Sequence, residues 1–259
     1  MISGHEHRFN LYYQRFREQF HKQPDICGHL HLKWEHSLKV LDNAAQILAV
    51  SDFPDSLRRA GLLAALYHDV ARFEQYAQFQ TFRDGLSFNH GVHGSQILKR
   101  EPWLLEGESR FDCSLVRAAV SMHNRACLPA GLPADYALVT GLVRDADKID
   151  ILRVLAPHMK AGAARSEAVT AHLPDIPNEW SGKIYADLLA GRYASYKDLR
   201  CLNDFRLLVC TWLFSLNFPA GLEIIRRQGH IFEILDSLPQ APEMDRARAV
   251  VQEVLTGCG

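Results

Sequence analysis

The sequence predicts an all-α protein. Apolar side chains recur every three to four residues in almost every segment, which is typical of amphipathic helices. No sustained valine-rich alternating run indicates a β-sheet, and no internal repeat or long heptad run indicates a solenoid or a coiled coil. The chain has 259 residues, 47% of them hydrophobic, which is enough for one large helical domain or two small ones.

The expected helices of the N-terminal part follow one another along the chain. An aromatic stripe from Phe9 to Phe20 has helical spacing and predicts a first helix whose stripe faces the core. Ser56 can serve as the N-cap of a helix over 57–70. Arg83-Asp84-Gly85 marks a loop between residues 76 and 89. Further helices are expected over 36–50, 90–99, 114–123 and 136–155.

A segment with two prolines, residues 171–180, marks the expected boundary between two parts of the chain. The predicted domains are therefore 1–170 and 171–259. The second part again shows helical spacing and is expected to pack on the first as a helical extension, or to continue the same domain. Its helices are expected over 183–189, 198–216, 220–235 and 243–255.

Composition excludes several classes of protein. The formal net charge of −1 argues against broad binding to nucleic acid or to anionic membranes, which needs a basic excess. No apolar run approaches the roughly 18 to 20 residues of a membrane span, and the charged N-terminus does not resemble a signal peptide. Dinucleotide, P-loop and serine-hydrolase motifs are also absent from the sequence. These features predict a soluble, cytoplasmic protein.

The strongest chemical signal is the pair His68-Asp69 within Leu66-Tyr67-His68-Asp69-Val70, at the end of an otherwise apolar helix. A buried aspartate is costly unless it is ion-paired, hydrogen-bonded or bound to a metal. Histidine beside it adds an imidazole nitrogen to the carboxylate oxygens. Such a mixed set of ligands suits Fe, Mn, Ni, Co or Zn better than Ca.

Other metal-binding candidates lie on separate predicted helices. His36 lies on an apolar helical face, His90 begins a helix, and His123 ends one. Helical bundles build metal sites from side chains of several helices in this way. A later apolar helix carries three aspartates, and helical phase does not choose among them: Asp145, Asp147 and Asp150.

The order of these residues resembles the HD-domain superfamily of metal-dependent phosphohydrolases. The resemblance rests on His36 within Glu35-His36-Ser37-Leu38-Lys39-Val40, on the segment Tyr67-His68-Asp69-Val70-Ala71-Arg72-Phe73, and on Asp147 within Ala-Asp-Lys. It covers about residues 29–155. Residues 156–259 resemble the helical tail of uncharacterised HD-domain proteins, which brings no known chemistry.

The resemblance implies an HD-type helical bundle in which four residues hold a first metal: His36, His68, Asp69 and Asp147. In subgroups with two ions, further histidines bind the second, and His90 and His123 match those positions. Asp69 would then bridge both ions. Asn124 stands where HD-GYP proteins have the second histidine of a His-His pair, so cleavage of cyclic-di-GMP is disfavoured.

The expected activity is hydrolysis of a phosphoester or phosphoanhydride in a nucleotide or another small phosphorylated metabolite. One or two divalent ions (Fe, Mn, Ni, Co or Zn, with Mg also allowed) would activate the attacking water. Besides Asp69, the catalytic candidates are His93 and Arg72. The residues expected to bind the substrate phosphate are Arg72, Arg125, Arg144 and Lys148.

Two alternatives stay open at this point. One is a catalytically silent HD-type protein that binds a ligand and regulates, and the other is a di-iron oxygenase. A small phosphorylated substrate is the expected partner in the enzymatic interpretation. Neither a nucleic acid nor a membrane is expected as a partner, and a dimer is compatible with the sequence.

Overall fold

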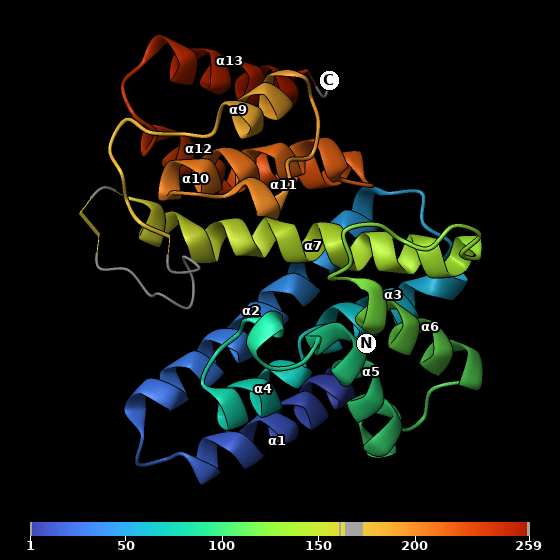
Figure 1. The fold of residues 1–259 in the computed structure, drawn as a ribbon. Helices are drawn as coiled ribbons and strands as arrows, with labels where there is room; N and C mark the ends of the chain where they lie inside the picture. The colour runs from blue at the N-terminus through green and yellow to red at the C-terminus, as the bar shows by residue number, and fades with distance from the viewer. Residues whose placement is uncertain (1, 161, 164–172, 258–259) are drawn as a thin grey trace. The chain divides into compact units, whose positions relative to one another are not determined.

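The computed structural model describes residues 2–160, 162–163 and 173–257. These residues form α-helices joined by short 3-10 helices and loops, and no β-strand occurs among them, which confirms the predicted all-α class (Figure 1). None of the described helices is long and apolar enough to cross a membrane.

The chain divides into two compact units, Met1–Asp147 and Lys148–Gly259. Their boundary lies inside helix α7 (Ala134–Met159), where nothing in the local sequence interrupts the helix. This division of the chain therefore lies before the segment with two prolines, residues 171–180. The boundary expected between residues 170 and 171 falls on residues outside those that the structure describes.

The first unit contains six complete α-helices, two 3-10 helices and the first half of α7. Helix α3 packs against α2 and α6, α5 packs against α6, and α1 contacts α2, α3 and α4. The elements are α1 (Ser3–Gln19), α2 (Pro24–Val50), α3 (Asp55–Tyr67), α4 (Ala71–Phe79), η1 (Asp84–Leu86), α5 (His90–Arg100), η2 (Pro102–Leu105) and α6 (Arg110–Met122).

The aromatic stripe of α1 packs into the core of this unit. Phe9 is fully buried, and its ring centroid lies 5.8 Å from that of Tyr67 and 5.6 Å from that of Phe73. Aromatic rings at such separations pack favourably beyond the area that they bury. The C-terminal end of the stripe is less enclosed, since Phe16 and Phe20 remain partly exposed.

Helix boundaries differ from the predicted ones at several places. Helix α2 begins at Pro24 rather than at residue 36, and proline is favoured in a first helical turn. Helix α3 begins at Asp55, so Ser56 is not its N-cap, and it ends at Tyr67 rather than at residue 70. The predicted loop from residue 76 begins only after α4, which ends at Phe79 and is followed by Gln80 with a left-handed φ of 50°.

The second unit contains a further set of short helices in addition to the end of α7. The helix expected over 198–216 is α10 followed by a 3-10 turn, and the one expected over 220–235 is divided at Gly229. Gly229 has a φ of 79°, a conformation that glycine adopts without strain. The elements are α9 (Gly182–Leu189), η3 (Tyr196–Asp198), α10 (Leu202–Cys210), η4 (Thr211–Ser215), α11 (Pro219–Gln228), α12 (His230–Asp236) and α13 (Pro242–Thr256).

Glu108 joins distant parts of the first unit. Its carboxylate accepts hydrogen bonds from Arg59 of α3 at 2.6 and 2.7 Å and lies 2.8 Å from His5 Nε2 of α1. The carboxylate is only 3% exposed. The hydrogen bond from Arg59 is the main reason why the pKa of Glu108 lies below its ordinary value, and burial opposes that effect.

We expect Glu108→Gln to lower the free energy of unfolding by about 1–3 kcal/mol, because Arg59 and the buried His5 lose a charged hydrogen-bond partner. Since the pKa of Glu108 is lowered on folding, the stabilisation is present above about pH 4.3 and is lost as the pH falls through the folded-state pKa. Urea unfolding of both proteins from pH 3 to pH 7 measures this difference.

The matched control is Glu106→Gln, because the Glu106 carboxylate is 72% exposed and pairs with Arg8 at the surface. Exposed ion pairs contribute about 0–1 kcal/mol. Equal losses of unfolding free energy in the two variants would contradict a stabilising role of the ionised Glu108 carboxylate. A loss in Glu108→Gln that does not become smaller at low pH would contradict it as well.

Candidate metal centre

The pair His68-Asp69 lies in a tight turn between α3 and α4. The turn is closed by hydrogen bonds from Val70 N to the Tyr67 carbonyl (3.1 Å) and from Arg72 N to the Asp69 carbonyl (2.9 Å). His68 is fully buried and Asp69 is 3% exposed. Both side chains are therefore held inside the first unit at the junction of two helices.

His36 of α2, His68 and Asp147 of α7 form a first group of potential metal ligands. The His36 Nε2 atom lies 3.1 Å from Asp147 Oδ1 and 3.2 Å from His68 Nε2, and His68 Nε2 lies 3.5 Å from Asp147 Oδ1. Three helix segments that are far apart in the sequence thus direct three donor atoms to one place.

His90 and His123 form a second group, with their Nε2 atoms 3.1 Å apart. This proximity depends on a close approach of α5 to α6. A Cβ atom on Gly91 would lie 2.9 Å from the Val120 carbonyl oxygen, and one on Gly94 would lie 2.9 Å from the Val120 side chain. Glycine is needed where backbones approach so closely.

Asp69 lies between the two groups. Its Oδ2 atom is 3.7 Å from the Nε2 atoms of both His36 and His68. Its Oδ1 atom is 3.4 Å from His90 Nε2 and 3.8 Å from His123 Nε2. Each carboxylate oxygen therefore belongs to one of the two groups.

Three of the histidine rings are oriented through their Nδ1 atoms. His68 Nδ1 bonds to the Ala65 carbonyl and His123 Nδ1 to the Val120 carbonyl, both at 2.8 Å. His90 Nδ1 lies 2.7 Å from Asp84 Oδ2. An Nδ1 proton donated to these acceptors leaves the Nε2 lone pair directed toward the centre, which is how metal-binding histidines are arranged in proteins.

Two cations contact the buried Asp69 carboxylate. Lys33 Nζ lies 2.8 Å from Oδ2, and Arg72 Nε lies 3.2 Å from Oδ1. Burial alone would raise the pKa of Asp69, but the charges of Lys33, Arg72 and the adjacent imidazoles outweigh burial and hold that pKa well below its ordinary value. The carboxylate is therefore ionised at neutral pH.

The imidazoles of the second group are neutral at physiological pH. Burial lowers the pKa of His90, and burial followed by the charges of His90 and His68 lowers the pKa of His123 to about 3. Neutral imidazole is the form that binds metal ions. The second group thus offers neutral nitrogen ligands beside the ionised carboxylate of Asp69.

The separations between these donor atoms fit a metal centre. Bonds of about 2.0–2.2 Å to one ion place neighbouring donor atoms roughly 3.0–3.5 Å apart. Within the first group the separations are 3.1–3.5 Å, and the second group has separations of 3.1 and 3.4 Å around His90. The two groups could hold divalent metal with small adjustments of the side chains.

Of the three aspartates of α7, the structure brings Asp147 to the histidines. Asp145 is fully buried, and Asp150 is bonded to Arg153 at 2.6 and 3.0 Å. Burial alone would raise the pKa of Asp147, but its hydrogen bonds with His36 and His68 hold the pKa well below its ordinary value.

His93, a catalytic candidate from the sequence, has a ring that pairs with another side chain. His93 Nε2 lies 2.7 Å from Glu74 Oε2, and its ring stacks on Phe88 with centroids 4.0 Å apart. Glu74 also accepts hydrogen bonds from Tyr12 and Arg100. Among the described residues, the structure brings His93 together with this acidic partner and not with the six potential ligands.

The remaining basic candidates also have contacts outside this cluster. Arg144 donates to the backbone carbonyls of His123, Arg125 and Ala126. The side chain of Arg125 is exposed and lines a cavity beside α6. Lys148 belongs to the second unit, where its Nζ lies 2.9 Å from Ser215 Oγ. Of the residues expected to bind substrate phosphate, Arg72 contacts side chains of the cluster, those of Asp69 and His90.

Two residues of the cluster were missed by the sequence analysis, Lys33 and Asp84. Lys33 precedes His36 by three residues on α2, and this spacing places both on one face of a helix. Asp84 was recognised only as part of a turn motif. Its contact with His90 depends on how the loop returns to the start of α5, for which the sequence contains no local signal.

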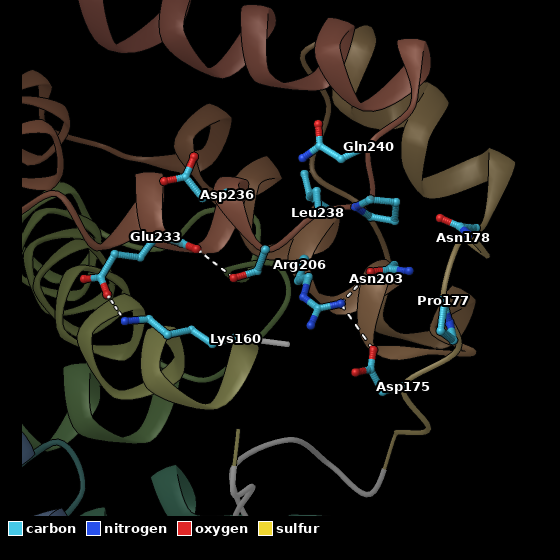
Figure 2. Close-up of a pocket in the computed structure, with 12 residues that line it drawn as sticks. Lys160, Asp175, Pro177, Asn178, Asn203, Arg206, Glu233, Asp236, Leu238 and Gln240 are labelled. Carbon is cyan, nitrogen blue, oxygen red and sulfur yellow. Dashed lines mark hydrogen bonds and ion pairs between the residues drawn. The ribbon is translucent and has the colours of Figure 1, made fainter. Parts of the chain in front are cut away.

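A separate cavity of about 580 Å³ lies in the second unit (Figure 2). Lys160 there pairs with Glu233 at 2.9 Å, and Arg206 contacts Asp175 at 3.4 Å. Arg206 also donates to the Asn203 side chain and to the Met159 carbonyl. Charged side chains that line this cavity thus pair with one another, and the lining contains none of the histidines described above.

An all-α unit whose helices direct histidine and aspartate side chains to one buried centre is a helical protein that could hold a metal ion there. Residues 34–152 match the family model described as the HD domain, which supports membership of this part of the chain in the HD-domain superfamily. All six potential ligands fall within the matched residues. Neither the curated proteins nor the solved structures that were searched contain a match to the chain.

Members of this superfamily are mostly metal-dependent hydrolases. The chain therefore has the fold of such enzymes and a group of His and Asp side chains that could hold a metal.

We expect Gly91→Ala to weaken divalent-metal binding by roughly tenfold, the lower end of effects seen when groups that orient metal ligands are disturbed. The added Cβ meets the Val120 carbonyl oxygen and the Asn124 side chain, so α5 must move away from α6 and His90 must move with it. Metal titration of chelator-treated protein measures the change.

Gly28→Ala is the control, because a Cβ on Gly28 has no atom within 4 Å and the residue lies in α2, away from the α5–α6 contact. Unchanged metal affinity in folded Gly91→Ala protein would show that the close approach is not needed for the site.

Proposed function

We propose that the HD domain of this chain is a binuclear metal-dependent phosphohydrolase. It would cleave a phosphoester or phosphoanhydride of a nucleotide or another small phosphorylated metabolite. The observation that supports this most strongly is the position of Asp69, whose two carboxylate oxygens each face a different pair of histidines. That arrangement is the one required of a carboxylate that bridges two ions.

In this proposal the ligands divide into two sets. His36, His68, Asp147 and Asp69 Oδ2 hold one ion, while His90, His123 and Asp69 Oδ1 hold the other. Mixed imidazole and carboxylate ligands suit Fe, Mn, Co, Ni or Zn, whereas Mg prefers oxygen ligands alone. The second set contains fewer protein ligands, which leaves room for substrate or water.

When bound, divalent ions lower the pKa of water from about 15.7 toward about 7 and polarise phosphoryl oxygens. The protein itself contributes fixed positive charge. Lys33 and Arg72 both contact Asp69, so their side chains lie at the edge of the centre where the oxygens of a phosphoryl group would be. Cations held in place before the reaction stabilise the negative charge that develops on those oxygens.

Arg72 is held rigidly for this role. Its Nη1 atom donates to the Gln75 side chain and to the Phe82 carbonyl, both at 2.7 Å, and also contacts Asp84. The ring of Phe82 lies under both cations, with its centroid 5.3 Å from Lys33 Nζ and 5.7 Å from the Arg72 guanidinium carbon. Such contacts with an aromatic face stabilise a cation.

The first prediction of this proposal concerns metal content. Protein purified without chelator should contain close to two equivalents of transition metal, measured by mass spectrometry. Asp69→Ala should lose most of both because the bridging group is removed, whereas His123→Ala should retain about one equivalent. His31→Ala is the control, since His31 lies on α2 with its ring stacked on Trp34.

The same preparations distinguish the alternatives. Hydrolysis of members of a phosphoester and phosphoanhydride panel, lost in Asp69→Ala, supports the proposal. Consumption of O₂ by an iron-loaded protein would instead identify a di-iron oxygenase. Tight binding of a phosphorylated ligand without turnover, in metal-loaded protein, would identify a catalytically silent binding protein.

A second prediction concerns Arg72. We expect Arg72→Gln to lower kcat/KM by roughly 100-fold on any phosphorylated substrate that the enzyme hydrolyses, as the loss of one group that stabilises developing charge does in other enzymes. Its metal content should stay close to wild type, because Arg72 binds the carboxylate and not the ion.

Arg83→Gln removes an equal charge from an exposed position in the segment that follows α4 and should leave kcat/KM unchanged. If metal content falls together with activity in Arg72→Gln, the residue positions the ligands instead of acting on the substrate.

A further inference from the structure

The outward face of α6 contains a cavity that is separate from the metal centre. Five residues of α6 line it, spaced at helical intervals: Ser114, Arg117, Ala118, Ser121 and Met122. The opposite face of α6 carries the fully buried residues 115, 116, 119 and 120 and leads to His123. The cavity has a volume of about 600 Å³ and is completed by α5, by the loop 125–133 and by the start of α7.

Two arginines give this cavity its charge. Arg117 and Arg125 both line it, and its lining contains no aspartate or glutamate. Within the described part of the chain, neither arginine forms an ion pair, and the buried Nε atom of Arg117 has no hydrogen-bond acceptor. A buried donor without an acceptor costs about 1–3 kcal/mol, so the protein leaves part of the hydrogen-bonding capacity of Arg117 unused.

Hydroxyl groups line the same cavity as the two arginines. Ser95 of α5, Ser114 and Ser121 of α6, and Tyr136 of α7 line the cavity, and Ser114 Oγ lies 2.9 Å from the Tyr136 hydroxyl. Arginine together with hydroxyl donors is a combination that matches the several oxygens of a phosphate group.

The rest of the wall is apolar. Met122, Leu132, Pro129 and Pro133 line the cavity beside the polar groups. A cavity of this size with one charged end and one apolar side accommodates more than an inorganic anion, because small-molecule sites combine apolar walls with a few placed polar groups.

We propose that this cavity is a second binding site, which takes an organic phosphomonoester. Its phosphate group binds Arg117, Arg125 and the nearby hydroxyls, and its organic part contacts the apolar wall. The site stands independently of the proposed hydrolysis, since none of the six potential metal ligands lines it.

The experiment uses the full chain after treatment with chelator, so that phosphate does not bind through metal. Inorganic phosphate and phenylphosphonate are titrated by calorimetry at constant ionic strength, set with sodium chloride. Both should bind saturably, and phenylphosphonate should bind more tightly because its ring contacts the apolar wall. Absence of saturable binding, or equal affinities of the two probes, would overturn the organic phosphomonoester assignment.

Substitutions then locate the binding. Arg117→Gln and Arg125→Gln should each weaken phenylphosphonate binding by roughly tenfold or more, the effect of losing a charge-assisted hydrogen bond. Arg110→Gln removes the same charge from an exposed position of α6 that does not line the cavity and should bind as the wild type does.

Unchanged affinity in both cavity variants would overturn the proposal, and so would loss of binding in Asp69→Ala, which would place the ligand at the metal centre. Arg125 is exposed, so its substitution should leave the fold intact. The Arg125 variant therefore tests the site even if the Arg117 variant does not fold.

Discussion

The first unit depends on the burial of one ionised carboxylate, that of Asp69. Removing a charged carboxylate from water costs several kcal/mol unless opposite charges and hydrogen bonds compensate. Here Lys33, Arg72 and the imidazoles around the carboxylate supply that compensation. A substitution that removes only one of these partners leaves the charged Asp69 carboxylate buried with less compensation.

The backbone of this unit is shaped by the same requirement. Helix α3 ends at Tyr67, and His68 and Asp69 lie in the turn that joins it to α4. Gly91 then allows α5 to approach α6 closely enough for His90 to reach the other side of the carboxylate.

Sequence analysis predicted the helical class and named the six potential metal ligands that the structure brings together. Helical phase alone did not select Asp147 over Asp145 and Asp150, since all three lie in one long helix that is buried on most of its surface. The resemblance to HD domains made that choice. Periodicity reports which face is buried, and it does not report what that face contacts.

The parts that were missed share a physical cause. Asp84 contacts His90 through a loop, and the break between α11 and α12 depends on the φ angle of Gly229. Neither feature changes the hydrophobic periodicity of the sequence. His93 failed as a partner of the centre because Glu74, on a neighbouring helix, lies 2.7 Å from its ring. Contacts between elements, and not the pattern within one element, decided each of these cases.

The six potential ligands come from helices or from the residues at helix ends, whereas part of the wall of the cavity beside α6 comes from the loop 125–133. Loops tolerate substitution and changes of length better than the helices that they connect. Mutations in that loop can therefore reshape the cavity without displacing a donor atom of the metal centre. The cavity beside α6 can therefore change the ligand that it prefers while the metal centre of the same helical unit keeps its ligands.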